Sequence, residues 1–190
     1  MRPRIVIAED ESITRMDLSE ILKEAGYHVV GEAADGFDAV EICRRQNPDL
    51  VIMDVKMPVM NGIQATENIL GENIAGCVLM LTAYNDGEFV NKANDLGVMG
   101  YLVKPIEEKT LLPAVKIALR RNEELRHYQK KAKDAEKKLE ERKCIERAKG
   151  ILMKKEGLSE DEAYAYLRSV SMQKRCSMGK IAEFIVASKI

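Results

Sequence analysis

The sequence predicts an α/β domain with a doubly wound, parallel five-stranded sheet, followed by a long helix and a C-terminal three-helix bundle. In residues 1–122 of the 190, short apolar or β-branched runs alternate with segments of helical period, as in parallel sheets covered by helices. Several of these runs are almost entirely apolar, which is typical of strands buried on both faces. After Pro105 the period stays helical to the end of the chain.

The elements of the first segment are expected in a regular order along the chain. Strands are predicted at residues 4–8, 28–33, 50–53, 77–82 and 100–103. Helices are predicted between them at residues 12–25, 36–45, 62–70 and 86–96. The first of these helices places apolar residues on one face, at Leu18, Ile21, Leu22 and Ala25. Together these segments make five successive strand–helix units.

A single long helix is predicted over residues 106–157, where Pro113 is tolerated near the start and Gly150 is the only other breaker. Its beginning would pack on the sheet through Leu111, Ala114 and Val115. From Glu123 onward apolar residues follow the 3-4-3-4 spacing of a coiled-coil seam, at Leu125, Tyr128, Ala132, Ala135 and Leu139. Two alanines weaken this seam, so a solvated single helix is the alternative to a homodimer.

The last segment predicts a small helical bundle. Ser159 and Glu162 form a capping-box pattern just after Gly157, so one helix ends and another begins there. A final helix is expected from about Ser177. The residues expected to face inward are Ile145, Ala148, Leu152, Ala163, Tyr166, Leu167, Val170, Ile181, Phe184 and Ile185. Such a core is marginal alone, and dimerisation through the coiled coil would stabilise it.

Charge and composition exclude several classes of protein. The net charge is −1, but residues 1–122 carry −6 and residues 123–190 carry +5, which suggests two separate tasks. No apolar run approaches the roughly 18–20 residues of a membrane span, and the chain begins without a signal-peptide pattern. The four cysteines are far apart, which argues against a zinc site or a disulfide framework. We therefore expect a cytoplasmic protein with reduced thiols and no membrane partner.

Polar residues lie at or just after the ends of four predicted strands: Glu9, Asp10, Asp54, Thr82 and Lys104. The carboxyl ends of parallel strands meet at one edge, so these side chains should line one rim. Three carboxylates there repel each other by about 4 kcal/mol per pair at about 4 Å and a dielectric near 20. A hard divalent ion, most plausibly Mg²⁺, and Lys104 would offset this repulsion. Asp54, ending a central strand, is then the candidate nucleophile for a phosphoryl group.

These residues and their neighbours resemble the receiver domain of two-component response regulators. The matching motifs are Ala8-Glu9-Asp10-Glu11, Asp54-Val55-Lys56-Met57-Pro58, Asn61-Gly62, Leu81-Thr82-Ala83 and Tyr101-Leu102-Val103-Lys104-Pro105. The resemblance implies a flavodoxin-like fold with strand order 2-1-3-4-5 and a sensor histidine kinase that phosphorylates Asp54. It implies Mg²⁺ ligands from Glu9, Asp10, Asp54 and the backbone carbonyl of Lys56.

The same resemblance assigns roles to the remaining residues of the rim. Thr82 and Tyr101 would form the conformational switch, and the side chain of Lys104 would contact the phosphoryl group. The peptide bond between Lys104 and Pro105 is expected to be cis. Glu9 stands where an aspartate is often found and still supplies an oxygen ligand. A receiver of this kind is a phosphoryl acceptor with at most slow self-dephosphorylation, so no enzyme activity is expected.

The C-terminal bundle offers a candidate surface for unpaired bases, although its composition alone favours an ordinary solvated face with one surface tyrosine. An exposed tyrosine among cations, with a methionine beside it, suits base stacking and phosphate binding. The order of residues resembles the ANTAR domain of transcription antitermination regulators, in Ala148-Lys149-Gly150-Ile151-Leu152-Met153, Ala163-Tyr164, Leu167-Arg168, Ser171-Met172 and Ile181-Ala182. The resemblance implies RNA contacts from Lys149, Gly150, Ala163, Tyr164, Arg168, Met172 and Arg175. The pattern looks most like the ethanolamine-utilisation antiterminator.

The sequence thus predicts a receiver domain over residues 1–122, a coiled-coil linker over 123–142 and an ANTAR domain over 143–190. We expect phosphorylation to favour a homodimer that binds tandem hairpins in nascent leader RNA and prevents termination. Two alternatives remain. A DNA-binding response regulator would prefer duplex DNA, and a protein-interaction output would need neither Lys149 nor Arg168. A free-standing enzyme finds no support, because the sequence has no catalytic triad pattern and no P-loop.

Overall fold

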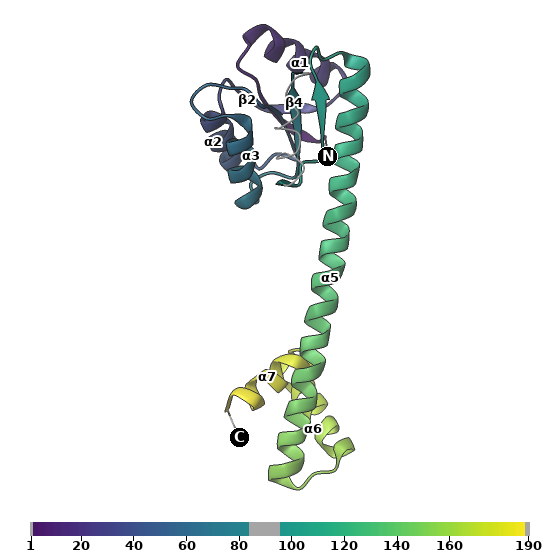
Figure 1. The fold of residues 1–190 in the computed structure, drawn as a ribbon. Coiled ribbons are helices and arrows are strands. Elements are labelled where there is room, and N and C mark those ends of the chain that lie inside the picture. The colour runs from purple at the N-terminus through teal and green to yellow at the C-terminus, as the bar shows by residue number, and fades with distance from the viewer. Residues whose placement is uncertain (1, 84–95, 189–190) are drawn as a thin grey trace. The chain divides into compact units, whose positions relative to one another are not determined.

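The computed structural model describes residues 2–83 and 96–188 (Figure 1). Its internal contacts divide the chain into two units, Met1–Arg126 and His127–Ile190. The helix expected at residues 86–96 lies almost wholly outside the described residues. Each unit is described separately below.

The first unit contains a five-stranded parallel sheet. Its strands are β1 (Arg4–Ala8), β2 (His28–Ala33), β3 (Leu50–Asp54), β4 (Val78–Thr82) and β5 (Gly100–Val103). Their order is β2-β1-β3-β4-β5, and every neighbouring pair is parallel. The predicted fold class and strand order are therefore confirmed, with β3 one residue longer and β4 one residue shorter than expected.

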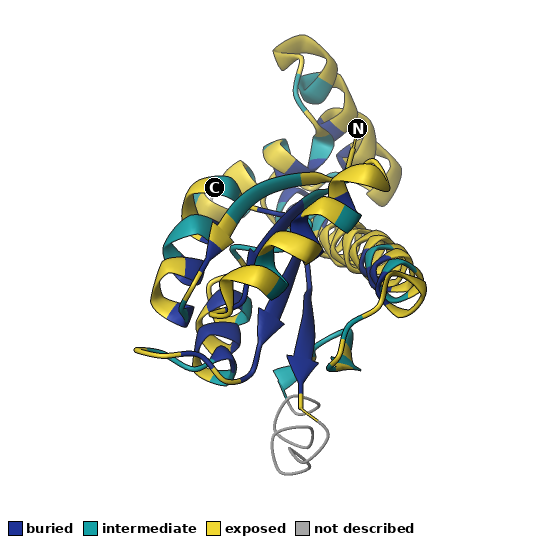
Figure 2. Ribbon diagram, turned by 90° about the horizontal axis from the view of Figure 1, so that it is seen from above, coloured by how far each residue is buried: buried dark blue, intermediate teal, exposed yellow. Residues whose placement is uncertain are grey.

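Helices cover both faces of this sheet because alternate strand residues point to opposite sides. The helices α1 (Ser12–Glu24) and α5 (Glu108–Glu156) pack on one face through residues such as Leu22 and Leu111. The helices α2 (Gly36–Gln46) and α3 (Gly62–Gly71) pack on the other. The inner strands β1, β3 and β4 are almost entirely buried, whereas residues of the edge strands β2 and β5 are partly exposed, as are the outer faces of the helices (Figure 2). Burial on both faces explains why the sequences of the three inner strands read as continuous apolar runs.

The start of α3 lies very close to the end of β3. Asn61 caps α3 by accepting a hydrogen bond from the backbone N–H of Gln64 at 2.9 Å. A Cβ atom on Gly62 would lie 1.9 Å from the carbonyl oxygen of Asp54. Only glycine fits there without moving backbone. The close approach of Gly62 to this carbonyl holds the backbone of Asp54 in place at the end of β3.

Helix α5 runs without interruption for 49 residues and includes Pro113. Leu111 and Val115 are fully buried against the sheet, as predicted. The residues of the predicted seam are all exposed, with Leu125 at 49%, Tyr128 at 66% and Leu139 at 54%. The described chain therefore presents an apolar stripe that a second helix could cover.

The second unit is a three-helix assembly built from the end of α5, α6 (Glu160–Lys174) and α7 (Met178–Ser188). Its core comprises Ala148, Leu152, Ala163, Leu167 and Ala182. Ser159 and Glu162 form the predicted capping box, with the Ser159 hydroxyl accepting from the Glu162 N–H at 3.3 Å. The Glu162 carboxylate in turn accepts from the Ser159 N–H at 2.8 Å.

Two residues of this unit were wrongly expected to face inward. Tyr166 is 49% exposed and Phe184 is 69% exposed. Both line a groove of about 720 Å³ between the helices instead. The small residues Ala148, Ala163 and Ala182 let the helices approach closely, so the interior has no room for two large rings.

No helix in the described ranges is long and apolar enough to cross a membrane. All four cysteines are free, and Cys43 and Cys77 are buried.

Candidate functional sites

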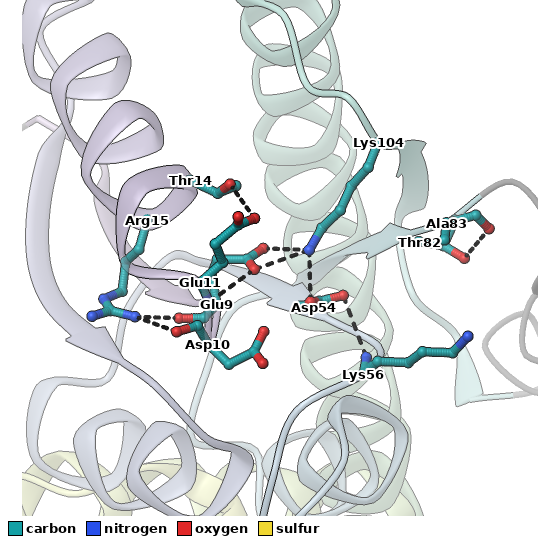
Figure 3. Close-up of polar contacts among 10 residues, drawn as sticks. All are labelled: Glu9, Asp10, Glu11, Thr14, Arg15, Asp54, Lys56, Thr82, Ala83 and Lys104. Atoms are coloured by element: carbon teal, nitrogen blue, oxygen red, sulfur yellow. Dashed lines mark hydrogen bonds and ion pairs between the residues drawn. The ribbon is translucent and has the colours of Figure 1, made fainter.

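The predicted rim forms at the carboxyl ends of the strands (Figure 3). Glu9 directly follows β1, Asp54 ends β3, Thr82 ends β4 and Lys104 directly follows β5. The ammonium of Lys104 lies between the two carboxylates. Its Nζ donates to Glu9 Oε1 at 2.9 Å and to Asp54 Oδ2 at 2.7 Å. The β-sheet order thus brings together side chains that are up to 95 residues apart in sequence.

Burial, hydrogen bonds and neighbouring charges shift the pKa values of Glu9 and Lys104. Burial raises the pKa of Glu9, the hydrogen bond from Lys104 lowers it, and the charge of Asp54 raises it, with a net rise. For Lys104, burial lowers the pKa, but hydrogen bonds and charges of Asp54 and Glu9 together raise it above its usual value. Lys104 is therefore firmly cationic and holds two carboxylates that would otherwise repel each other.

A divalent cation fits the carboxylate cluster. Oxygen atoms of Glu9, Asp10 and Asp54 all lie within 4.8 Å of one another. Among the described residues, Glu9 Oε2 is buried and accepts no hydrogen bond, although it lies 2.7 Å from Lys104 Nζ. Asp10 is exposed and can turn toward an ion. Three carboxylates with one lysine leave spare negative charge and a buried oxygen without a hydrogen bond, which suits a hard cation with oxygen ligands.

The other predicted residues surround this cluster. The backbone N–H of Lys56 donates to Asp54 Oδ1 at 3.3 Å, and the Thr82 hydroxyl donates to the Ala83 carbonyl at 3.1 Å. Tyr101 is 49% exposed, so its ring points outward here. The Lys104–Pro105 bond is cis, as expected.

In the second unit the predicted RNA-contact residues separate into two groups. Gly150, Tyr164, Arg168, Met172 and Arg175 are exposed. Ala163 is fully buried, and Lys149 is 7% exposed and engaged by Glu146 and Glu160. Hydrogen bonds to Glu160 first, and then to Glu146, raise the pKa of Lys149. Neither Ala163 nor Lys149 therefore presents a free side chain in this conformation.

Comparison with protein families decides the identity of both units. Residues 5–116 match the response regulator receiver domain, and residues 133–186 match the ANTAR domain. The chain is a response regulator. The transcriptional regulatory protein PdtaR of Mycobacterium tuberculosis is 43% identical over 183 residues, which cover 96% of this chain and 89% of PdtaR. The finer resemblance to the ethanolamine-utilisation antiterminator stays a prediction.

Solved receiver structures resemble the first unit of this response regulator. The chemotaxis protein CheY4 of Vibrio cholerae is 30% identical with a TM-score of 0.58, and the alignment covers 62% of this chain and 99% of CheY4. A CheX–CheY–BeF₃–Mg²⁺ complex from Borrelia burgdorferi matches with 30% identity and a TM-score of 0.56, covering 59% of this chain and 85% of that one.

The two families fix the class of activity of the response regulator. Its receiver domain is a non-enzymatic phosphoryl acceptor, which confirms the expectation that the chain is not an enzyme. Its ANTAR domain is an RNA-binding antitermination output domain. A receiver domain also implies a kinase as partner.

Sequence reasoning missed one residue of the response regulator's acidic site. The Arg15 side chain, from the first turns of α1, donates through Nη1 to the carbonyls of Glu9 at 2.5 Å and Asp10 at 3.3 Å (Figure 3). It holds the turn on which two of the three carboxylates sit. An arginine on an amphipathic helix reads as a solvated charge, so no sequence signal marks this role.

Proposed function

We propose that this response regulator is activated by phosphorylation of Asp54 and then prevents transcription termination by binding RNA. A sensor histidine kinase in the cytoplasm would donate the phosphoryl group. The activated chain would form a homodimer and bind tandem hairpins in nascent leader mRNA. The observation that supports this most directly is the Lys104 ammonium between Glu9 and Asp54, in a chain that also has an ANTAR domain.

The chemistry at Asp54 follows from its neighbours. A carboxylate oxygen of Asp54 attacks phosphorus, and the bond from phosphorus to the kinase histidine breaks. Lys104 is placed to neutralise a phosphoryl oxygen. Glu9, Asp10, Asp54 and the backbone carbonyl of Lys56 would hold Mg²⁺, which when bound neutralises further charge on the phosphoryl oxygens. The Mg²⁺ of the related CheX–CheY complex supports this choice of ion.

Thr82 and Tyr101 would transmit the change. The Thr82 hydroxyl, now on the Ala83 carbonyl, would turn to the phosphoryl group. The exposed ring of Tyr101 would then move inward. The exchange of one hydrogen-bond partner of Thr82 for another is a small local change that would shift the balance between the two positions of the Tyr101 ring.

The exposed seam of α5 would join two copies of the activated chain. Leu125, Tyr128, Ala132, Ala135 and Leu139 form this seam within the proposed linker, residues 123–142. The proposed receiver and ANTAR domains then occupy residues 1–122 and 143–190. Two ANTAR domains in one dimer would bind two hairpins, and the second contact gains from effective concentration.

The RNA surface would use the exposed members of the predicted set. Tyr164 would stack on an unpaired base, and Arg168 and Arg175 would bind phosphates. Met172, 72% exposed, would cover an adjacent base, and Gly150 would allow close approach of the backbone. Ala163 would act only by its small size, because its side chain is buried.

The first experiment is a gel shift at fixed salt and with Mg²⁺, with and without a small-molecule phosphodonor. The probes are a two-hairpin RNA and duplex DNA of the same sequence. We expect RNA-selective binding that strengthens with the phosphodonor, and Asp54→Ala should lose this gain. Salt is held fixed because nucleic-acid affinities depend steeply on it.

The alternatives give different patterns. Equal or stronger binding to the duplex would favour a DNA-binding regulator. Binding to neither probe would contradict the RNA output and favour a contact with another protein. Activity that survives replacement of Arg168 by alanine would point the same way.

A further inference from the structure

Lys149 is the one buried lysine or arginine among the described residues of the second unit. Its side chain is 9% exposed, yet the carboxylates over it, Glu146 and Glu160, are 57% and 67% exposed. Glu146 precedes Lys149 by one turn of α5, whereas Glu160 belongs to the first turn of α6. The ammonium therefore joins two helices beneath a layer of negative charge.

The hydrogen bonds of Lys149 are fully used. Its Nζ lies 2.6 Å from Glu160 Oε1, and 3.0 and 3.2 Å from the two oxygens of Glu146. An ammonium has three N–H donors, and three acceptors occupy them. One cation facing two carboxylates leaves a local negative charge, which repels a phosphate. An RNA phosphate would have to displace both partners to reach Lys149.

The pair fixes α6 at the end from which the proposed RNA surface extends. Tyr164 and Arg168 follow Glu160 at intervals of four residues, so all three lie along one side of α6. Ala148 on α5 and Ala163 on α6 are fully buried next to this junction, which lets the helices approach closely. The bond from Lys149 to Glu160 thus sets the first turn of the helix that bears Tyr164 and Arg168.

We propose that Lys149 is a positioning residue and not an RNA contact. Together with Glu160 and Glu146 it orients the Tyr164–Arg168 side of α6 for RNA. This reassigns a residue that the resemblance placed among the contacts, and it rests on the proposed RNA binding.

The test uses the full chain with Mg²⁺ and a phosphodonor, and a synthetic two-hairpin RNA as probe. Glu160→Gln breaks the interhelical ion pair, and Asp161→Asn is its matched control. Both remove one negative charge from the exposed first turn of α6, so their long-range effects on RNA are alike. We expect Glu160→Gln to bind RNA about three- to tenfold more weakly than Asp161→Asn, because the network couples the two helices.

A direct contact predicts the opposite sign. If Lys149 binds phosphate, Glu160→Gln frees it and tightens RNA binding beyond Asp161→Asn. That result, or equal affinity of the two variants, overturns the proposal.

The salt dependence gives a second readout that a merely structural effect leaves unchanged. Removal of a phosphate contact lowers the slope of log affinity against log salt by about one. We expect Lys149→Met to weaken binding with the slope of the unmodified chain. A slope reduced by about one contradicts the proposal, even if Lys149→Met also loses some helix content. If the unmodified chain binds no RNA, the proposed function fails, whereas a tighter Glu160→Gln overturns this inference alone.

Discussion

Arg15 shows how a single side chain can order a candidate metal site without supplying a ligand. It donates to the backbone carbonyls of Glu9 and Asp10, so it orders the turn without itself occupying their carboxylates. We expect Arg15→Ala to weaken Mg²⁺ binding about three- to tenfold, as supporting residues around metal sites commonly do. Titration with Mg²⁺, followed by amide NMR shifts, measures this. Arg45→Ala, at an exposed position of α2, is the control, and unchanged or tighter binding in Arg15→Ala would contradict the assignment.

Cys43 illustrates the effect of burial on a thiol. Burial raises its pKa from 9.0 to about 12. At pH 8.5 its thiolate fraction is therefore about a thousandfold below that of an ordinary cysteine, and the thiolate is the reactive form. We expect iodoacetamide to modify the half-buried Cys176 at least tenfold faster than Cys43 in the native chain, as mass spectrometry would show. Equal labelling rates at the two cysteines would contradict this expected difference in reactivity.

The raised pKa of Cys43 also makes stability depend on pH. Because the folded state keeps the proton on this thiol, the stability of the first unit should fall as pH rises from about 9 toward 12.

At the scale of the element, the local stability of α6 depends on the capping box in its first turn. Ser159 and Glu162 satisfy two backbone donors there. We expect Ser159→Ala to cost about 1 kcal/mol of local stability, which is about fivefold faster hydrogen exchange at the start of α6. Hydrogen-exchange mass spectrometry of a peptide covering residues 158–168 measures it. Ser169→Ala, in the exposed middle of the same helix, should leave the rate unchanged, and equal rates in both variants would refute the capping role.

The helices, the strands and the acidic rim could be predicted from the sequence more fully than the side-chain packing of the second unit. The order of Glu9, Asp54 and Lys104 along the strands was enough to place them together, because parallel strands end at one edge. The exposure of Tyr166 and Phe184 could not be predicted, because helical periodicity gives a face but not whether the neighbouring helices leave room. The pairing of Lys149 with Glu160 was hidden for a similar reason. The pairing depends on how α5 and α6 pack against each other, whereas in the sequence Lys149 and Glu160 look like two ordinary surface charges.

At the scale of the whole molecule, the exposed seam of α5 determines the expected assembly. Leu125 and Leu139 are about half exposed in the single chain. Two alanines keep the seam weak, so we expect monomer and dimer to be in equilibrium. In the proposed function, phosphorylation shifts this equilibrium toward the dimer. We expect sedimentation velocity to show more dimer when a phosphodonor is added, and Asp54→Ala to lose the response. Leu125→Glu combined with Leu139→Glu should keep the chain monomeric, whereas a dimer insensitive to these changes would place the interface elsewhere.

Gly62 has a consequence for how this protein can change over generations. Its missing side chain is what lets α3 begin against the backbone of Asp54, since even one carbon would lie 1.9 Å from that carbonyl oxygen. The outer faces of the helices can accept many substitutions at little cost. At Gly62 a mutation would disturb the strand that ends at the proposed phosphoacceptor, Asp54, without altering any of the site's side chains. If Asp54 has the proposed role, descendants that keep this role should inherit the glycine with it.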